Sequence, residues 1–192
     1  MSLKLIVAED EAIIRIDLVE LLGESGFDVV AQTGRGDEAF SLVEEHKPDL
    51  IVLDIKMPGL DGIAVTQKIT EMQTTAVLIL SAFSQQDLID QAQAAGAQGY
   101  LVKPFHKAEL VPAIETAYAR FKEKLFLEGV DSADPGQIKK NFANAKAVLM
   151  DEHSLSEKES WCFIESQLTD DEEANAKVLD QIAGGSLSPT SK

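Results

Sequence analysis

The stretch DLIVLDIKMPGLDG, residues Asp49–Gly62, decides the fold class of this chain. Four apolar residues, Leu50 to Leu53, run directly into the carboxylate of Asp54, and a Met-Pro-Gly turn follows. A short apolar run bounded by turn residues is typical of a strand that is buried on both faces, as in a parallel sheet. We therefore predict that Asp54 lies at the carboxyl end of a strand and faces a loop.

Similar apolar runs recur along the first two thirds of the chain, with helix-like periodicity in each interval between them. The predicted strands cover residues 3–8, 27–31, 50–53, 76–80 and 98–102. This alternation predicts a doubly wound α/β domain with a five-stranded parallel sheet. In the first interval, Ile13, Ile16, Val19 and Leu22 recur at helical spacing, which predicts an amphipathic helix with these residues on its apolar face.

The last helix of this domain carries Leu110, Ile114, Ala117, Phe121 and Leu125, alternately four and three residues apart. Such spacing fits a coiled-coil seam and hence a dimer contact. It equally fits a helix that lies on its own sheet, although this second interpretation weakens beyond residue 119, where no strand remains to be covered.

A second unit begins after the segment EGVDSADPG, residues 128–136, which gathers turn-forming residues. We expect three short helices there, over residues 137–152, 156–168 and 169–183, and capping boxes of Ser156 with Glu159 and Thr169 with Glu172 support the last two starts. The predicted organisation is a domain over 1–124 whose last helix continues to about 128, a linker over 129–136, a small three-helix domain over 137–183 and a disordered tail over 184–192.

Composition narrows the function classes. The chain has 192 residues, one cysteine and a net charge of −16. No apolar run approaches the roughly 20 residues that span a bilayer, and a strongly acidic chain has no general electrostatic attraction to nucleic acid or anionic membrane. We expect a cytoplasmic protein that binds neither membrane nor DNA.

Chemically active residues stand at the predicted strand ends. Glu9 and Asp10 end the first strand, Asp54 the third, Ser81 the fourth, and Lys103-Pro104 the fifth. In open parallel sheets these ends share one edge, where ligands bind. Three carboxylates about 4 Å apart repel by roughly 4 kcal/mol per pair at an effective dielectric constant near 20, so the cluster needs a cation.

Oxygen ligands without histidine or cysteine favour Mg²⁺. Lys103 would clamp an anion brought to the metal, and the Ser81 hydroxyl could donate a hydrogen bond to that anion. In such a site Asp54 could attack a phosphoryl group and hold it as an acyl phosphate.

At this point four motifs resemble those of a known family, the CheY-like receiver domain of two-component response regulators, over about residues 3–124. The motifs are VAEDE (7–11), LDIKMPGLDG (53–62), LSAF (80–83) and YLVKPF (100–105). The resemblance implies that a sensor histidine kinase phosphorylates Asp54, and that the backbone carbonyl of Lys56 joins Glu9, Asp10 and Asp54 as a magnesium ligand. It also implies a cis bond before Pro104 and a switch pair of Ser81 and Tyr100.

Phosphohydrolases of the haloacid dehalogenase type form a competing class, because they too use a strand-end aspartate with Mg²⁺. They place a second aspartate two positions later as a general acid, where this chain has Lys56. We therefore expect a reversible covalent switch, not an enzyme with turnover.

The second unit resembles the ANTAR module, a three-helix RNA-binding domain of antitermination regulators. The matching residues are Ala145, Lys146, Leu149, Met150, the Leu155-Ser156-Glu157 turn, Glu159 and Trp161. The resemblance implies binding to hairpins in leader transcripts, transcription antitermination, and formation of a homodimer on phosphorylation.

The composition of this second unit argues against strong RNA binding. Residues 125–192 hold 6 lysines, no arginine and 13 acidic residues, a net charge of −7. The candidate RNA contacts are Lys139, Lys140 and Lys146, with Trp161 as a stacking platform unless it lies in the core with Ile164 and Leu168. The alternative is a dimerisation or protein-docking module that no longer binds RNA.

Overall fold

The computed structural model divides into two compact units, which meet in the sequence between Phe121 and Lys122. The structure describes residues 2–129, 135–169 and 172–189; within these ranges the side chains of 127–129, 135–139 and 172–173 lie outside the description. Among the described helices, none combines the length and the apolar character that crossing a bilayer requires. The first unit ends slightly before the boundary predicted at residue 124.

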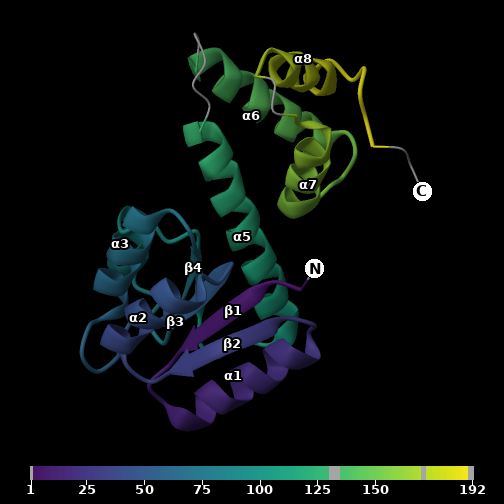
Figure 1. Ribbon diagram of the computed structural model, residues 1–192. Helices are drawn as coiled ribbons and strands as arrows, with labels where there is room; N and C mark the ends of the chain where they lie inside the picture. Colours follow the sequence, from purple (N-terminus) through teal and green to yellow (C-terminus); the bar gives the residue numbers. More distant parts are fainter. Residues whose placement is uncertain (1, 130–134, 170–171, 190–192) are drawn as a thin grey trace. The chain divides into compact units, whose positions relative to one another are not determined.

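Strands and helices alternate through the first unit (Figure 1). In order they are β1 (Lys4–Ala8), α1 (Ala12–Glu24), β2 (Asp28–Thr33), α2 (Gly36–His46), β3 (Leu50–Asp54), α3 (Gly62–Met72), β4 (Ala76–Ser81), α4 (Gln86–Ala94), β5 (Gly99–Val102) and α5 (Lys107–Gly129). The strands form one parallel sheet in the order β2-β1-β3-β4-β5. The predicted doubly wound α/β fold with a five-stranded parallel sheet is confirmed, and its strand order is that of flavodoxin-like folds.

The central strands are apolar because both faces of the sheet are covered. Every residue of β3 and β4 is buried, and only Lys4 of β1 is exposed. Side chains of α2, α3 and α4, such as Val43, Val65 and Ala92, pack into a core with Ile6 and Ile51 on one face. Helix α1 and the first half of α5 cover the other face (Figure 1).

Helix α1 buries only the C-terminal part of the face that its apolar spacing predicted. Leu18 and Leu22 are buried, but Ile13 and Ile16 are 78% and 59% exposed. The helix is apolar around much of its circumference, so the spacing of its isoleucines could not by itself select the buried face. Two large apolar side chains, Ile13 and Ile16, therefore lie on the surface of α1.

The candidate seam on α5 packs within its own unit. Leu110, Ile114 and Ala117 are at most 1% exposed. Gly99 of β5 makes room for this helix, since a Cβ atom there would lie 3.3 Å from the Ala117 Cβ. These three residues therefore cover the sheet, in agreement with the second of the two interpretations, a helix that lies on its own sheet.

The second unit contains the last turns of α5 with α6 (Pro135–Asp151), α7 (Glu157–Gln167) and α8 (Glu172–Ala183). Its core is apolar and consists of Phe142, Ala145, Leu149, Trp161, Ile164, Leu179 and Ile182. Helix α6 begins at Pro135, inside the predicted linker, because proline suits the first turn of a helix. Residues 130–134 of that linker lie outside the described residues.

Helix α7 has the predicted capping box, in which Ser156 and Glu159 each accept a hydrogen bond from the other's backbone N–H. At α8 the predicted box of Thr169 with Glu172 falls partly outside the described residues. The described contact there is with Asn175, whose amide accepts from the Thr169 N–H at 2.8 Å and donates to its carbonyl at 2.9 Å.

The predicted disordered tail begins too early. Gly184 and Gly185 donate hydrogen bonds back to carbonyls of α8, and Ser186 and Leu187 do the same. Gly185 has a φ angle of +69°, the left-handed conformation that commonly ends a helix. Residues 184–187 therefore form a hydrogen-bonded cap directly after α8, and residues 190–192 lie outside the described residues.

A pair of glycine variants tests how tightly the loop after β3 is packed. A Cβ on Gly62 would lie 2.1 Å from the Asp54 carbonyl oxygen and 2.8 Å from the Ile55 Cα, whereas a Cβ on Gly23 meets nothing within 4 Å. We expect Gly62→Ala to lower the free energy of unfolding by at least about 2 kcal/mol. Gly23→Ala, in α1, should raise it by about 0.5–1 kcal/mol. Urea titration followed by far-UV circular dichroism measures both, and equal effects would contradict the packing described.

Candidate functional site

Four strands end together at one edge of the sheet. Ala8 of β1 pairs with Leu53 of β3, and Ser81 of β4 pairs with Val102 of β5. The residues that follow, together with Asp54, therefore meet at this edge. The strand register brings Glu9, Asp54, Ser81 and Lys103 together, although they are far apart in the sequence.

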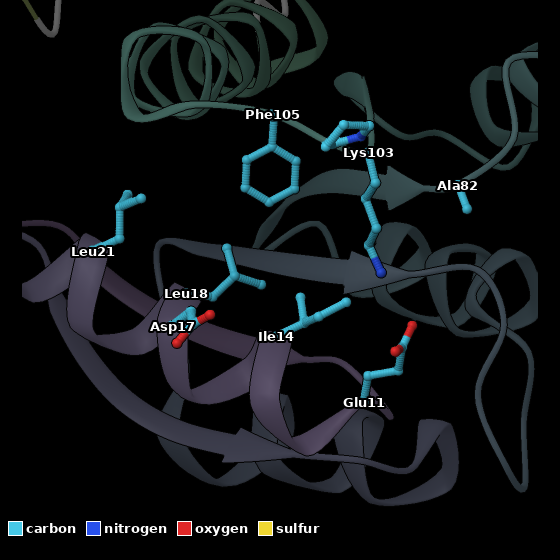
Figure 2. Close-up of a pocket in the computed structure, with 9 residues that line it drawn as sticks. Glu11, Ile14, Asp17, Leu18, Leu21, Ala82, Lys103 and Phe105 are labelled. Carbon is cyan, nitrogen blue, oxygen red and sulfur yellow. The ribbon is translucent and has the colours of Figure 1, made fainter.

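A pocket of about 610 Å³ opens beside Lys103 (Figure 2). Apolar side chains from α1, including Ile14, Leu18 and Leu21, line it together with Pro104 and Phe105. Glu11 and Asp17 add acidic groups to the wall. The site is therefore bordered by a hollow that is apolar on the α1 side.

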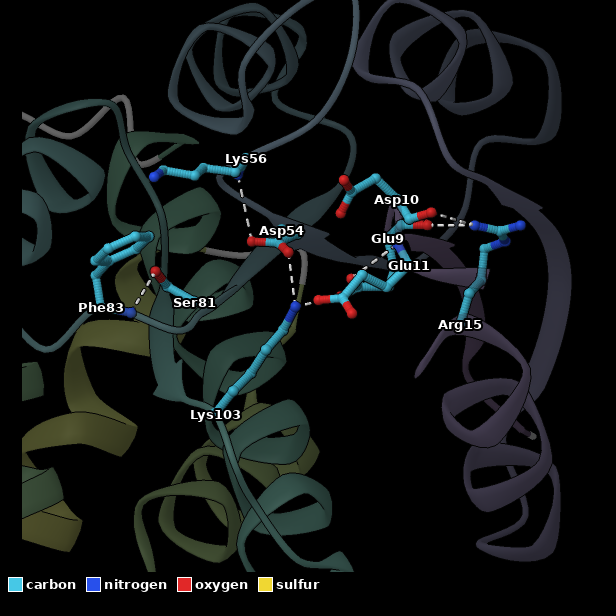
Figure 3. Close-up of polar contacts among 9 residues, drawn as sticks. All are labelled: Glu9, Asp10, Glu11, Arg15, Asp54, Lys56, Ser81, Phe83 and Lys103. Atoms are coloured by element: carbon cyan, nitrogen blue, oxygen red, sulfur yellow. Dashed lines mark hydrogen bonds and ion pairs between the residues drawn. The ribbon is translucent and has the colours of Figure 1, made fainter. Parts of the chain in front are cut away.

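Three carboxylates gather at the strand ends. One oxygen each from Glu9, Asp10 and Asp54 lies within 4.8 Å of the others (Figure 3). Glu9 is fully buried and Asp54 is 7% exposed, whereas Asp10 is open to solvent. Three acidic groups this close are mutually repulsive unless a cation offsets their charge. The donor set of carboxylate oxygens is the one that Mg²⁺ prefers, so these residues fit the predicted metal.

Lys103 provides positive charge inside the cluster. Its Nζ donates to the Glu9 carboxylate at 2.5 Å and to the Asp54 carboxylate at 2.6 Å, and its side chain is only 12% exposed. Both contacts run from β5 across the strand ends to β1 and β3 (Figure 3). Lys103 therefore stands where it can bind an anion attached to Asp54. The Lys103-Pro104 bond is cis, the isomer that the resemblance implied.

Burial sets the protonation of this group of residues. Burial raises the pKa of Glu9 above its usual 4.5, the hydrogen bond from Lys103 opposes the rise, and the charge of Asp54 adds to it. For Lys103, burial alone would lower the pKa, but the hydrogen bonds to Asp54 and Glu9 outweigh it and hold the pKa above 10.5. The lysine is therefore charged at neutral pH and favours ionised carboxylates around it.

The β3–α3 loop holds Asp54 in place. The Lys56 N–H contacts the Asp54 carboxylate at 3.3 Å, and the Gly62 N–H donates to the Ile55 carbonyl at 2.8 Å. Asp61 caps α3 by accepting from the Ala64 N–H at 2.9 Å. The turn after β3 is therefore fixed at both ends.

Ser81 and Tyr100 are linked through one residue, Phe83. The fully buried Ser81 hydroxyl accepts from the Phe83 N–H at 3.1 Å, and the Tyr100 hydroxyl donates to the Phe83 carbonyl at 2.7 Å. The Lys56 ammonium also lies 4.2 Å from the centre of the Phe83 ring. The backbone of Phe83 thus connects the two residues of the predicted switch pair, a link that the sequence did not indicate.

Arg15 is a second residue that the sequence analysis missed. Its guanidinium donates to the backbone carbonyl of Glu9 and, at 3.4 Å, to that of Asp10 (Figure 3). Helix α1 starts shortly after Asp10, so its first turns lie close to the end of β1. The short separation between Asp10 and Arg15 in the sequence could therefore have predicted that Arg15 lies near this strand end.

In the second unit, Trp161 is a core residue. It is 4% exposed, and its ring lies 5.9 Å from that of Phe142 and 6.0 Å from that of Phe126. Trp161 is therefore too buried to act as the stacking platform for RNA bases that was expected. The spacing of Trp161 and Ile164 reflects a buried helix face, which was the alternative given for Trp161.

Lys146 is also held inside the second unit. Its ammonium pairs with Glu123 at 2.5 Å and with Glu157 at 3.0 Å, and its side chain is 16% exposed. Although burial lowers the pKa of Lys146, the hydrogen bonds to these two glutamates raise it above 10.5 overall. This lysine is therefore not available to phosphate groups in this arrangement. Lys140 is exposed, and the side chain of Lys139 lies outside the described residues.

The fold and the acidic edge define a class of protein. Residues 5–115 match the model of the response regulator receiver domain, more than half of the chain. The chain belongs to this family.

Relatives show how far the similarity extends. The transcriptional regulatory protein PdtaR of Mycobacterium tuberculosis is 41% identical over 169 residues, which cover 87% of this chain and 82% of PdtaR. The chemotaxis protein CheY of Bacillus subtilis is 36% identical over 115 residues, 59% of this chain and 96% of CheY. Among solved structures, the receiver domain of the response regulator NarL from Mycobacterium tuberculosis has a TM-score of 0.59 and 30% identity, over 61% of this chain and 96% of that domain. The match to PdtaR alone among these three extends through most of the second unit.

Removal of Lys103 tests its part in the carboxylate cluster. We expect Lys103→Met to lower the free energy of unfolding of the metal-free protein by about 3 kcal/mol, because two buried carboxylates lose their counter-charge. Lys56→Met removes the same charge from the same edge and should cost less than about 1 kcal/mol. Urea titrations with EDTA and with Mg²⁺ measure this, and Mg²⁺ should stabilise Lys103→Met more than the wild type. Equal losses in the two variants would show that Lys103 does not neutralise the cluster.

Proposed function

We propose that this protein is a response regulator in a two-component phosphorelay, in which a sensor histidine kinase phosphorylates Asp54 and the second unit carries the output. The observation that carries the proposal is the buried group of Glu9, Asp54 and Lys103 at the strand ends, with Asp10 beside it. A carboxylate nucleophile, metal-binding carboxylates and a positive clamp together suit reversible transfer of a phosphoryl group.

In the proposed reaction, an oxygen of Asp54 attacks the phosphorus atom of a phosphohistidine. A new oxygen–phosphorus bond forms as the nitrogen–phosphorus bond breaks, and the imidazole leaves with its electron pair. Glu9, Asp10, Asp54 and the Lys56 carbonyl would hold Mg²⁺, which would supply positive charge to the phosphoryl oxygens. Lys103 then contacts the transferred group, since its ammonium already lies 2.6 Å from the Asp54 carboxylate.

The switch proceeds through Phe83. The Ser81 hydroxyl can donate its proton to a phosphoryl oxygen on Asp54, and a shift of this side chain weakens its bond to the Phe83 N–H. The Phe83 carbonyl is bonded to the Tyr100 hydroxyl, so a change at Ser81 reaches Tyr100 through a single residue. In this way a change of charge at Asp54 becomes a rearrangement of the loop after β4.

The kinase partner needs an apolar docking surface beside Asp54. Ile13 and Ile16 are exposed on α1, and Ile14 and Leu18 of the same helix line the pocket beside Lys103. A helix that carries a phosphohistidine could cover these side chains while its imidazole reaches Asp54.

Position 56 holds a lysine, where a hydrolase of the haloacid dehalogenase type would have its second aspartate. This difference supports a reversible switch and not a hydrolase with turnover.

For the output, we propose regulation of transcription through RNA. The ANTAR-like sequence of the second unit supports this, as does the similarity over 87% of the chain to a relative named as a transcriptional regulatory protein. The expected ligand is a leader-transcript hairpin, bound so as to prevent termination, with phosphorylation favouring a homodimer. Lys140 is the exposed candidate contact among the described residues.

A second candidate output is a protein-docking or dimerisation module. The burial of Trp161 and the pairing of Lys146 with two glutamates favour it, because both remove expected RNA contacts. The net charge of −7 over residues 125–192 also leaves little electrostatic attraction to phosphates.

Labelling with acetyl phosphate tests the phosphoacceptor. With Mg²⁺ present, the wild type should form an acid-stable, base-labile adduct, and Asp54→Asn should reduce labelling to background because the amide is not a nucleophile. Asp61→Asn changes a nearby carboxylate whose described contact is a helix cap, and it should retain full labelling. Undiminished labelling of Asp54→Asn would show that a different residue accepts the phosphate.

Filter binding against two-loop leader hairpins tests the output. Low-salt titrations with and without beryllofluoride, an acyl-phosphate mimic, should show retention that increases with the mimic. Lys140→Gln should weaken binding several-fold and reduce the log–log salt slope by about 0.8, the loss of one phosphate contact. No retention in either state would refute RNA binding and leave the docking module, which light scattering detects as a mimic-dependent dimer.

A further inference from the structure

We infer that Arg15 is a positioning residue for the metal site and acts through the backbone of Glu9 and Asp10. This inference rests on the proposed magnesium site. It goes further by assigning a role to a residue of α1 that contributes no metal ligand. The observations are the two hydrogen bonds from the Arg15 guanidinium to the carbonyls of these ligand residues.

The backbone of Glu9 is fixed on both sides. Its N–H donates to the Thr33 carbonyl of β2 at 3.0 Å, and its carbonyl accepts from Arg15. With the peptide groups on either side of its Cα held, the Glu9 side chain is directed toward Lys103 and Asp54. The weaker bond to the Asp10 carbonyl extends the same support to the exposed member of the cluster.

Arg15 directs its charge to backbone carbonyls, not to acidic side chains. Within the described part of the chain, no carboxylate lies within ion-pair distance of its guanidinium, although the site beside it is acidic. Gly34, just after β2, leaves space for this group, since a Cβ atom there would lie 3.0 Å from the Arg15 Nη1 and 3.6 Å from the Glu9 carbonyl oxygen. The guanidinium therefore occupies a place formed by α1, the end of β1 and the loop after β2.

The sign of the effect separates positioning from simple electrostatics. Loss of a nearby positive charge, taken alone, strengthens the binding of a divalent cation. Loss of a group that orients the ligands weakens it, commonly by tenfold or more. Weaker Mg²⁺ binding after removal of Arg15 therefore indicates lost orientation, because the charge effect has the opposite sign.

The test is the Mg²⁺ dissociation constant of the full-length protein, measured by isothermal titration calorimetry. We expect Arg15→Met to weaken binding about tenfold, and Arg15→Lys to restore part of the loss because its ammonium can still donate to one carbonyl. Arg35→Met removes an equal charge nearby from a residue that pairs with Asp37, and its affinity should be unchanged or slightly higher. Raising the Mg²⁺ concentration should restore the acetyl phosphate labelling rate of Arg15→Met.

Gly34→Ala provides an independent variant, because its methyl group crowds the flexible Arg15 guanidinium at 3.0 Å, whereas its distance of 3.6 Å from the Glu9 carbonyl oxygen is an ordinary van der Waals contact. We expect about threefold weaker Mg²⁺ binding, and no further loss when it is combined with Arg15→Met. Wild-type affinity in Arg15→Met, or a Gly34→Ala effect that persists undiminished in the double variant, would overturn the inference alone. No Mg²⁺ binding by the wild type would overturn the proposed function as well.

Discussion

The structure depends on the repulsion among acidic groups at one edge of a parallel sheet. Glu9 and Asp54 are buried there, and an uncompensated pair of buried carboxylates would be strongly destabilising. Lys103 offsets this repulsion through two short ion pairs. Because the same ammonium lies 2.6 Å from the Asp54 carboxylate, the interaction that stabilises the edge also suits the phosphoryl transfer that we propose.

Much of this edge could be predicted from the sequence. Apolar runs fix the strands, the topology brings their ends together, and the residue types at those ends specify a hard cation and an anion. The roles of Phe83 and Arg15 could not be predicted in the same way. Both act through backbone groups, and a sequence does not show which carbonyl or N–H a side chain will reach.

Helices were harder to predict where apolar residues surround the axis or where a helix serves two cores. On α1 the spacing of Ile13, Ile16 and Leu22 predicted one apolar face, yet of these three only Leu22 is buried, together with Leu18. In the second unit Phe126, from the last turns of α5, packs against Phe142 and Trp161. The second unit therefore includes part of a helix that the sequence pattern assigned to the first domain, and Phe126 from this helix contributes to the burial of Trp161.

The central claim is that Asp54 accepts a phosphoryl group beside a divalent cation held by its acidic neighbours. The most direct measurement is a crystal structure of the protein with Mg²⁺ and beryllofluoride. The account predicts beryllium bonded to an oxygen of Asp54, Mg²⁺ coordinated by Glu9, Asp10 and Asp54, and Lys103 in contact with a fluorine atom. An adduct on another carboxylate, or Mg²⁺ bound away from these three residues, would contradict it.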